Sequence, residues 1–438
     1  MPAAPQNQRV MSGVNDVGFL FISWTRFVFY LLFIAGTILA LVRFIFISIL
    51  AIYQRRKTKQ ISYDSSFTPF VNVIIPAHNE EKLIVKTVRS ALNSSYPHFR
   101  VTVVDDGSCD QTYDVIAHAF KDNPKVFLLT KENTGKAGAL NLALQKVDAD
   151  IIIFQDADTL MMPDAIEKLV RHFVNPTVAA VAGNAKVGNR VNFLTKCQAL
   201  EYITSQNLDR RAFDVLNCVM VVPGAIGAWR AELVKSAGGF SDDTLAEDAD
   251  LTLHLLKKGY TVHYEEDAIG LTEAPDTVHG FFRQRFRWMY GTLQVVWKNR
   301  DVMLNRRYGI LGMLALPNVF IFQILFPFLA PFADLVAFTT IGVALWQEHQ
   351  HPLGYSPDTV IHILFYYALF LFVEALASVL AFLLESKEDK RLLTWLFIQR
   401  FFYRQLMYVI AVRSVLTALQ GPIVGWHSVE RKATVEER

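Results

Sequence analysis

Two carboxylates one residue apart, Asp156 and Asp158, directly follow the apolar run Ile151–Phe154. Carboxylates at this spacing can share a hard cation that also binds the oxygens of a diphosphate, and such a cation neutralises a diphosphate leaving group. The same pattern also occurs in solvated loops that contain two acids. Its place at the end of a predicted strand favours the metal site when the other polar clusters are considered with it.

Acidic residues also follow two earlier apolar runs. Asp105 and Asp106 come after Val101–Val104, and Glu80 ends the polar stretch that follows Val71–Ile75. A carboxylate at such a strand end can accept a hydrogen bond from a base N–H or a ribose hydroxyl. The pair Asp105 and Asp106 would also suit a turn and a helix cap, so both roles agree with the sequence.

A lysine among small residues precedes a predicted helix. Lys136 lies in the stretch 132–138, and this arrangement can hold phosphate by charge and by backbone amides. The stretch lacks the full spacing of a Walker motif, which disfavours a nucleoside triphosphatase.

Two more acids, Glu247 and Asp248, precede the amphipathic run 251–256. One of them could act as a general base if it is held in a cleft. The usual alternative is an acidic first turn that complements the dipole of the following helix.

A mixed cationic and aromatic motif follows at Gln284, Arg287 and Trp288. The cationic side chain can bind diphosphate, and the tryptophan offers a flat face to a sugar ring. Arginine and tryptophan also anchor interfacial helices at a membrane, and both roles can hold at once.

The elements around these residues indicate a soluble α/β domain over 61–304. Its apolar runs predict strands, and amphipathic stretches near 81–92, 111–120 and 137–146 predict helices between them. This alternation predicts a parallel sheet covered on both faces, with ligands beyond the carboxyl ends of its strands. The polar clusters lie at those ends.

The composition indicates a membrane protein. The 438 residues include 43 Lys and Arg against 41 Asp and Glu, and the formal charge of +2 gives no reason to expect a nucleic-acid partner. Hydrophobic residues make up 52% of the chain and are concentrated toward both ends. The scattered cysteines Cys109, Cys197 and Cys218 are predicted to be reduced packing residues.

The predicted organisation has four parts: a retained membrane anchor at 1–60, the α/β domain at 61–304, transmembrane or interfacial helices at 305–420, and a polar tail at 421–438. The anchor would fit one long tilted helix or a tight hairpin. Basic residues within 54–59 favour the cytoplasmic side for the domain. Three later apolar regions are each long enough to cross a bilayer, at 310–345, 360–384 and 392–419.

Taken in order, these motifs resemble the processive members of glycosyltransferase family two. The resemblance runs from about Val71 to Trp297 and rests on Pro76-Ala77-His78-Asn79-Glu80, Asp105-Asp106-Gly107-Ser108, Lys136-Ala137-Gly138, Asp156-Ala157-Asp158, Glu247-Asp248 and Gln284-x-x-Arg287-Trp288. It implies an α/β GT-A-type, Rossmann-like cytoplasmic domain flanked by transmembrane helices. It further implies a UDP-sugar donor, a Mg²⁺ or Mn²⁺ ion and a place in the cell membrane.

The resemblance also implies residue roles. Donor binding would involve Glu80, Asp105, Asp106, Lys136 and Asp156, and the metal would be held by Asp156 and Asp158. Asp248, beside Glu247, would be the base, although Ala246 replaces the threonine of the family motif. The acceptor and diphosphate end would involve Gly224, Gln284, Arg287 and Trp288.

The implied activity is inverting, processive extension of a polysaccharide that is passed across the membrane. The layout is most similar to poly-N-acetylglucosamine and chitooligosaccharide synthases, so UDP-N-acetylglucosamine is the preferred donor and UDP-glucose the second. The segment 222–230 departs from the cellulose synthase pattern. Transfer of one sugar to a lipid acceptor and a non-enzymatic transporter or scaffold are the alternatives. A small accessory membrane subunit is plausible, but no residue requires one.

Overall fold

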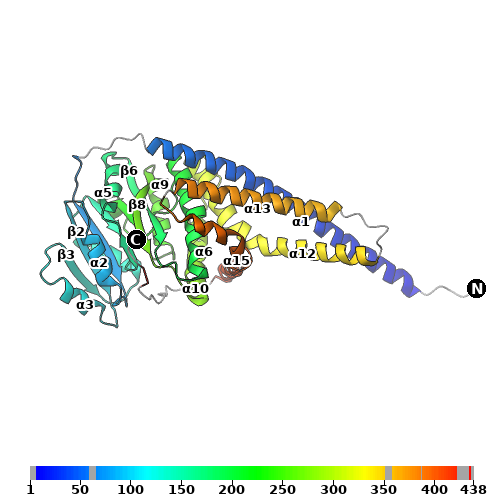
Figure 1. Cartoon of the computed structure of the whole chain (residues 1–438), viewed down its shortest axis with the longest axis horizontal. Helices are drawn as coiled ribbons and strands as arrows, with labels where there is room; N and C mark the ends of the chain where they lie inside the picture. Colours follow the sequence, from blue (N-terminus) through cyan, green and yellow to red (C-terminus); the bar gives the residue numbers. More distant parts are fainter. Residues whose placement is uncertain (1–5, 59–65, 351–357, 386, 422–433, 436–438) are drawn as a thin grey trace, which may run out of the picture. The chain divides into compact units, whose positions relative to one another are not determined.

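The computed structural model describes residues 6–58, 66–350, 358–385, 387–421 and 434–435 (Figure 1). The chain divides into two compact units. One unit comprises Met1–Phe46 and Leu329–Ala377, and the other comprises Ile47–Phe328 and Ser378–Arg438. The second unit contains the predicted α/β domain and all of its candidate site residues.

An eight-stranded mixed sheet forms the centre of this second unit, in the order β3-β2-β1-β4-β7-β6-β8-β5 (Figure 1). The strands are β1 Val71–Ala77, β2 Phe99–Asp106, β3 Val126–Lys131, β4 Ile151–Phe154, β5 Thr159–Met161, β6 Val178–Val187, β7 Gly227–Arg230 and β8 Thr261–Thr272. The neighbouring strands β3, β2, β1 and β4 are parallel, as the alternation of runs and helices predicts. The wholly parallel sheet is wrong for the remainder, because β7 pairs antiparallel with β4 and β6 and β5 pairs antiparallel with β8.

Helices connect the strands and cover the sheet. Those predicted between the first strands are confirmed as α2 Ile84–Leu92, α3 Thr112–Ala119 and α4 Lys136–Lys146. The later helical elements of the domain are α5 Ala165–Val170, η1 Arg171–Val174, α6 Phe193–Glu201, the π-helix η2 Tyr202–Asn207, α7 Leu208–Val215, α8 Ala231–Ser236, α9 Glu247–Lys257, α10 Val278–Lys298 and η3 Arg306–Tyr308.

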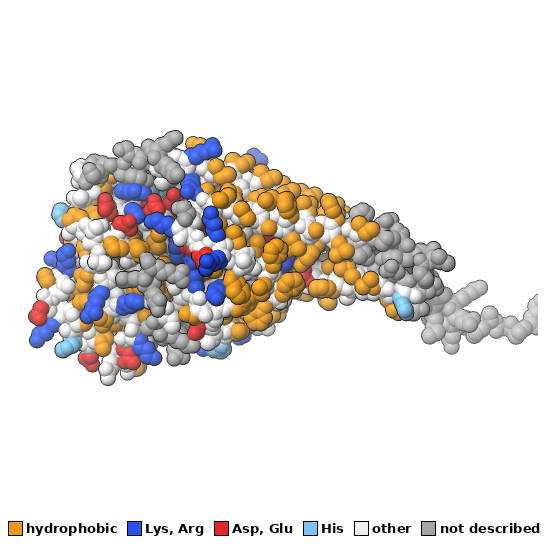
Figure 2. Space-filling model, in the orientation of Figure 1, with side chains coloured by type: hydrophobic (Ala, Val, Ile, Leu, Met, Phe, Trp, Pro, Cys, Tyr) orange, Lys and Arg blue, Asp and Glu red, His pale blue; other side chains and the backbone are white. Residues whose placement is uncertain are grey.

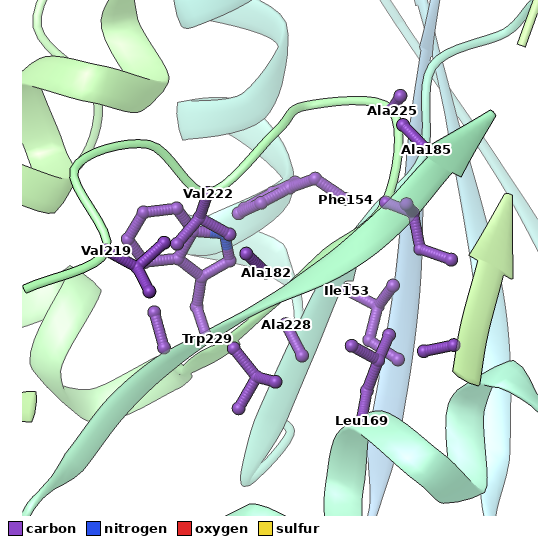
Figure 3. Packing of buried hydrophobic residues seen from close by; sticks show 14 of the residues in the cluster. Ile153, Phe154, Leu169, Ala182, Ala185, Val219, Val222, Ala225, Ala228 and Trp229 are labelled. Carbon is purple, nitrogen blue, oxygen red and sulfur yellow. The ribbon is translucent and has the colours of Figure 1, made fainter. Parts of the chain in front are cut away.

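An aromatic cluster anchors the central strands to each other (Figure 3). Trp229 on β7 is 2% exposed and packs against Phe154 and Phe240, with ring centroids 6.5 and 6.2 Å apart. Phe154 and Phe240 themselves meet edge to face at 4.8 Å. Removal of a buried ring of this size typically costs about 3–5 kcal/mol. Because Phe154 ends β4, the cluster also fixes the strand end from which Asp156 emerges.

The anchor is one continuous helix, α1 Gln6–Thr58, so the single-helix alternative agrees with the structure and the hairpin does not. The helical elements after η3 are η4 Leu311–Ala315, α11 Leu316–Val319, η5 Phe320–Leu325, α12 Phe326–Gln350, α13 Asp358–Leu384, η6 Lys390–Thr394, α14 Trp395–Gln399 and α15 Tyr403–Gln420.

Within the described residues, three helical stretches are long and apolar enough to cross a membrane: Ile34–Thr58, Leu311–Val343 and Leu364–Leu384. On the face drawn in Figure 2, hydrophobic side chains gather over the long helices, whereas charged side chains are frequent over the sheet domain. The region 392–419 is divided among η6, α14 and α15, and none of these helices is among the three stretches. Instead, α15 packs along α10.

Two features differ from the predictions made for cysteines and for the tail. Cys197 and Cys218 are buried, but Cys109 is exposed, so its prediction as a packing residue is wrong. Cys109 lies in the loop after β2, where its backbone N–H donates to the side chain of Asn79 at 2.8 Å. Most of the predicted polar tail lies outside the described residues, and within it Val435 is buried against the domain.

Candidate active site

A cavity of about 430 Å³ brings most of the predicted site residues together. Its lining includes Lys136, Asp156, Asp158, Gly224, Glu247, Asp248, Gln284, Arg287 and Trp288. These residues come from α4, the end of β4, the loop before β7, and the helices α9 and α10. The expectation that ligands bind beyond the carboxyl ends of the strands therefore agrees with the position of the cavity.

Lys136 links two of the predicted acidic motifs. Its Nζ lies 2.6 Å from Asp156 Oδ1 and 3.4 Å from Glu247 Oε1. Burial disfavours the charged ammonium, but the carboxylates of Asp156 and Glu247 outweigh burial and raise the pKa of Lys136 above its ordinary value. The lysine is therefore a permanent cation at the first residue of α4, where its charge and the backbone N–H groups of the helix N-terminus suit a phosphate.

Gly224 makes this arrangement possible because it leaves room for the lysine. A Cβ at this position would lie 2.5 Å from Lys136 Nζ and 3.4 Å from Asp156 Oδ1. Any side chain would therefore displace the ammonium. The backbone N–H of Gly224 also donates to Asp248 Oδ2 at 3.3 Å, so the glycine contacts both functional sides of the cavity.

Asp248 has the properties of a general base. It lies in the first turn of α9, and the backbone N–H of Ala249 donates to its Oδ1 at 2.8 Å. Burial and the neighbouring Glu247 carboxylate raise the pKa of Asp248 to about 6, although Lys136 opposes the shift. A carboxylate with such a pKa is ionised at neutral pH and remains basic enough to accept a proton from a hydroxyl during reaction.

Asp156 and Asp158 both line the cavity and fit a divalent cation that is shared with a ligand. Asp158 is held in place by the hydroxyls of Thr159 and Thr272, each 3.2 Å from its Oδ1. In the described ranges, no group of three or more His, Cys, Asp or Glu residues forms a metal site by itself. Mg²⁺ is commonly held by one or two carboxylates together with substrate phosphates, so two acids are a sufficient protein donor set here.

The predicted donor residues Glu80, Asp105 and Asp106 are not part of the cavity lining. Asp106 instead organises the loop that precedes Lys136. Its Oδ1 accepts from Lys131 Nζ at 2.8 Å, and its Oδ2 accepts from the backbone N–H of Gly135 at 2.8 Å. Lys131 is thus a residue that the sequence reasoning missed, and its place at the end of β3, beside the acidic end of β2, was the available signal.

The loops that carry these three acids are joined to each other. The backbone N–H of Glu80 donates to the Thr112 hydroxyl at 2.8 Å, and Asp105 accepts weakly from the Thr130 hydroxyl and the Ser108 amide at 3.4 Å. These contacts fix the edge of the sheet formed by β1, β2 and β3. A base-binding role for Glu80, Asp105 and Asp106 stays a prediction.

Another part of the cavity lining comes from α10, which Thr277 caps by accepting from the backbone N–H of Gly280 at 3.1 Å. Gln284 is buried, and Trp288 is partly buried against Tyr202 with centroids 6.2 Å apart. Beneath the tryptophan, the guanidinium of Arg285 lies 4.2 Å from the ring centroid and 2.8 Å from Glu201. The indole therefore packs on the buried guanidinium of Arg285, which the partly exposed Glu201 holds in place.

Residues 72–230 match the family model described as "Glycosyl transferase family 2". This segment is a glycosyltransferase family 2 domain. The expected recognition and the expected class of enzyme domain are confirmed by this match.

Similar proteins extend the comparison beyond the family 2 domain. A protein called poly-beta-1,6-N-acetyl-D-glucosamine synthase, from Staphylococcus aureus (strain COL), is 28% identical over 248 residues, which are 55% of this chain and 60% of the relative. The protein of the same name from Staphylococcus epidermidis is 27% identical over 227 residues, or 52% of this chain and 55% of the relative. The chain thus spans no more than about three fifths of the length of these relatives.

A solved structure shares the fold. It is the mannosyltransferase PcManGT from Pyrobaculum calidifontis in complex with GDP-Man and Mn²⁺, with a TM-score of 0.57 and 21% identity, over 88% of this chain and 98% of that one. The GT-A-like fold of the family 2 domain, with candidate membrane helices on both sides of it, is therefore confirmed.

Proposed function

We propose that this chain is a membrane-embedded, inverting glycosyltransferase that extends a polysaccharide from a UDP-sugar, with UDP-N-acetylglucosamine as its preferred donor. The family 2 domain supports the reaction class. The donor is supported by the name of the staphylococcal relatives and by the motif layout. The three candidate spans and the basic residues within 54–59 support a multi-pass protein whose domain faces the cytoplasm.

The proposal rests on the surroundings of Gly224, where groups that suit a leaving diphosphate and a group that suits a general base lie close together. The glycine lies between Lys136 with Asp156, which suit a diphosphate, and Asp248, which suits a base. The acceptor hydroxyl would lose its proton to the Asp248 carboxylate as its oxygen bonds to the anomeric carbon. The bond from that carbon to the diphosphate oxygen would break, and UDP would depart with the electron pair.

The leaving group requires positive charge at the same moment. Lys136 supplies one such charge from the protein itself. A divalent cation bound by Asp156 and Asp158 would supply charge neutralisation of the diphosphate. Stabilisation of developing charge is usually the largest catalytic contribution, and a positioned base typically adds 10²–10⁴-fold.

The cavity lining also indicates the side on which the product would leave the active site. Its lining continues from Trp288 to Asn318 and Phe322, which belong to the helical stretch that begins the second candidate span. Polar Asn318 and aromatic Phe322 suit a sugar chain, because sugars combine hydroxyl groups with flat apolar faces. This continuity supports delivery of the polymer toward the membrane helices.

The deciding experiment measures UDP release by the purified full-length protein in detergent with Mn²⁺. UDP-N-acetylglucosamine, UDP-glucose and UDP-glucuronate are offered separately, beside Asp248→Asn as the control. We expect release that depends on Asp248 with one donor, together with a polymer of that sugar. Release without polymer would indicate single-sugar transfer or hydrolysis, and no release with any donor would refute the proposed reaction.

A further inference from the structure

One helical face in the cavity carries a polar stripe that the proposed reaction does not use. The cavity-lining residues of η2 and α7 recur at intervals of three, four or one: Tyr202, Ser205, Gln206, Asp209, Arg210 and Phe213. Residues at these intervals share one face of a helix. Arg210 is the cation of this stripe, and it lines the same cavity as Lys136 and Asp248.

Arg210 has acidic residues in its surroundings but no direct ion-pair partner among the described residues. Its Nη1 donates one hydrogen bond, to Asn207 Oδ1 at 3.4 Å. In the part of the chain that the structure describes, no carboxylate forms an ion pair with this guanidinium. Burial lowers the pKa of Arg210 below its ordinary value, although Asp248 and Asp209 oppose the shift. The cation is therefore held in a place that disfavours its charge.

The next residue of α7, Arg211, has a structural role and provides a comparison. Arg211 is 2% exposed, and its Nη2 lies 2.8 Å from Glu385 Oε1. It also pairs with Glu266 and lies over the ring of Tyr264. Successive residues of a helix point about 100° apart, so α7 directs one arginine into a neutralised cluster and the other into the cavity.

We propose that Arg210 forms an oxyanion subsite of the cavity, at which its guanidinium binds a phosphate or carboxylate group of a substrate. The inference rests on the proposed function, because it assumes that nucleotide sugar and acceptor meet in this cavity. A planar guanidinium can donate two parallel hydrogen bonds to such a group, and these are stronger than neutral hydrogen bonds. The substrate would then provide the counter-charge that the protein lacks at this point.

Two substrates can supply this oxyanion. One is the diphosphate of the donor, for which Arg210 would add a second protein cation to Lys136. The other is an acidic group on the sugar or the acceptor, such as the carboxylate of a uronate or the phosphate of a lipid. The two sources share their chemistry at Arg210, and binding and transfer measurements distinguish them.

The first measurement is calorimetric titration of the full-length protein with UDP and with uridine, in detergent with Mn²⁺. Arg210→Gln is compared with wild type and with Arg89→Gln, which removes the same charge from an exposed position on α2. We expect Arg210→Gln to weaken UDP binding by about 10- to 100-fold, the loss typical of a hydrogen bond to a charged group, and to leave uridine binding unchanged. Arg89→Gln should resemble wild type in both titrations.

The second measurement assigns the oxyanion if UDP binding is unchanged. UDP release is followed with UDP-glucuronate, and separately with UDP-N-acetylglucosamine in the presence and absence of a polyprenyl phosphate. A loss in Arg210→Gln that is confined to the uronate donor, or to the reaction with lipid phosphate, places the acidic group on the sugar or on the acceptor. If Arg210→Gln stays within twofold of wild type in every titration and every reaction, the subsite is refuted.

Thermal unfolding separates a binding role from a structural one. Arg210→Gln removes a poorly compensated charge, so its melting temperature should equal or exceed that of wild type, whereas Arg211→Gln should melt lower. Equal destabilisation by the two substitutions would overturn the inference. Wild-type protein that binds no UDP would instead refute the proposed function, and the inference would fall with it.

Discussion

At the residue scale, the pKa of Asp248 reflects two opposing electrostatic effects within the cavity. Burial and Glu247 favour the protonated acid, while Lys136 favours the carboxylate, and the balance leaves a pKa of about 6. Lys136 itself stays charged because Asp156 and Glu247 surround it. Asp248 is therefore basic enough to take a proton, while Lys136 keeps its charge in ion pairs with Asp156 and Glu247.

This balance predicts an acidic limit to activity. Below a pH of about 6 Asp248 becomes protonated and cannot accept a proton, so kcat/KM should fall about tenfold per pH unit and stay level above that pH. UDP release measured between pH 5 and pH 8 tests this expectation. A rate that stays level down to pH 5 would show that the essential base has an ordinary carboxylate pKa.

The stability of an Asp248→Asn variant provides the control for that profile. Because the folded-state pKa is raised, protonation of Asp248 favours the folded state, and the ionised form lowers stability at neutral pH. Asp248→Asn should therefore lose activity without a lower melting temperature at pH 7. A large loss of stability in this variant would indicate that its inactivity reflects misfolding.

At the scale of elements, sequence patterns located β1, β2 and β4 but not β6, although every residue of β6 is buried as well. The run 151–154 is wholly apolar and the run 71–75 is apolar except for Asn72, because helices or other chain segments cover both faces of β1 and β4. The same reasoning failed to identify β8, in which Glu265, Glu266 and Asp267 interrupt the pattern. Glu265 and Glu266 have partners from η1 and α7, respectively, that no local pattern reveals.

One residue of the candidate site, Arg210, could not be predicted from the sequence because it follows the π-helix η2. The acidic motifs at strand ends could be predicted because each follows its strand directly. The role of Arg210 could not, since a π-helix changes the number of residues per turn just before α7. A regular helical projection from the sequence therefore does not tell which of Arg210 and Arg211 faces the cavity. The choice between one anchor helix and a hairpin was also open, because the apolar stretch is longer than the roughly 20 residues that one span needs.

The ionic cluster around Glu385 makes α7 essential to stability. Glu385 lies 2.8 Å from both Arg211 and Lys186, and these cations outweigh burial and lower the pKa of Glu385. Arg211→Gln would remove one of the two cations that pair with Glu385 and the partner of Glu266, and loss of a buried ion-pair partner typically costs about 3–5 kcal/mol. Thermal unfolding of the full-length protein in detergent should show a clearly lower melting temperature.

The matched comparison is Glu385→Gln combined with Arg211→Gln. The double variant should recover part of the loss, because it removes the carboxylate as well as its partner. If Arg211→Gln is as stable as wild type, Lys186 alone is sufficient to balance Glu385. The cluster would then contribute little to the position of α7.

At the scale of the whole molecule, the ends of two long helices contact the same short helix of the family 2 domain. Gln54, near the end of α1, donates to Asp214 at 3.3 Å, and Glu385, directly after α13, pairs with Arg211. The candidate spans Leu311–Val343 and Leu364–Leu384 lie between the domain and Glu385, and two crossings return a chain to the side from which it started. The proposed multi-pass topology therefore requires that Gln54 and Glu385 lie on the same side of the membrane.

The exposed Cys109 allows that side to be identified. Burial raises the pKa of Cys197 to about 12 and that of Cys218 to about 11, so neither thiol should react, whereas Cys109 is exposed in the loop after β2. Because Arg55, Arg56 and Lys57 lie at the end of the first candidate span, we expect a cytoplasmic domain. A membrane-impermeant maleimide should therefore label the protein in inverted vesicles and leave it unlabelled in intact cells.

Cys109→Ser is the control for this labelling experiment, and it should abolish the signal in inverted vesicles without loss of UDP release, because Cys109 is not part of the cavity lining. Labelling in intact cells that disappears in Cys109→Ser would place the domain outside the cytoplasm. UDP-sugars made in the cytoplasm could not reach the cavity from there. That outcome would therefore contradict the orientation and also the donor on which the proposed reaction depends.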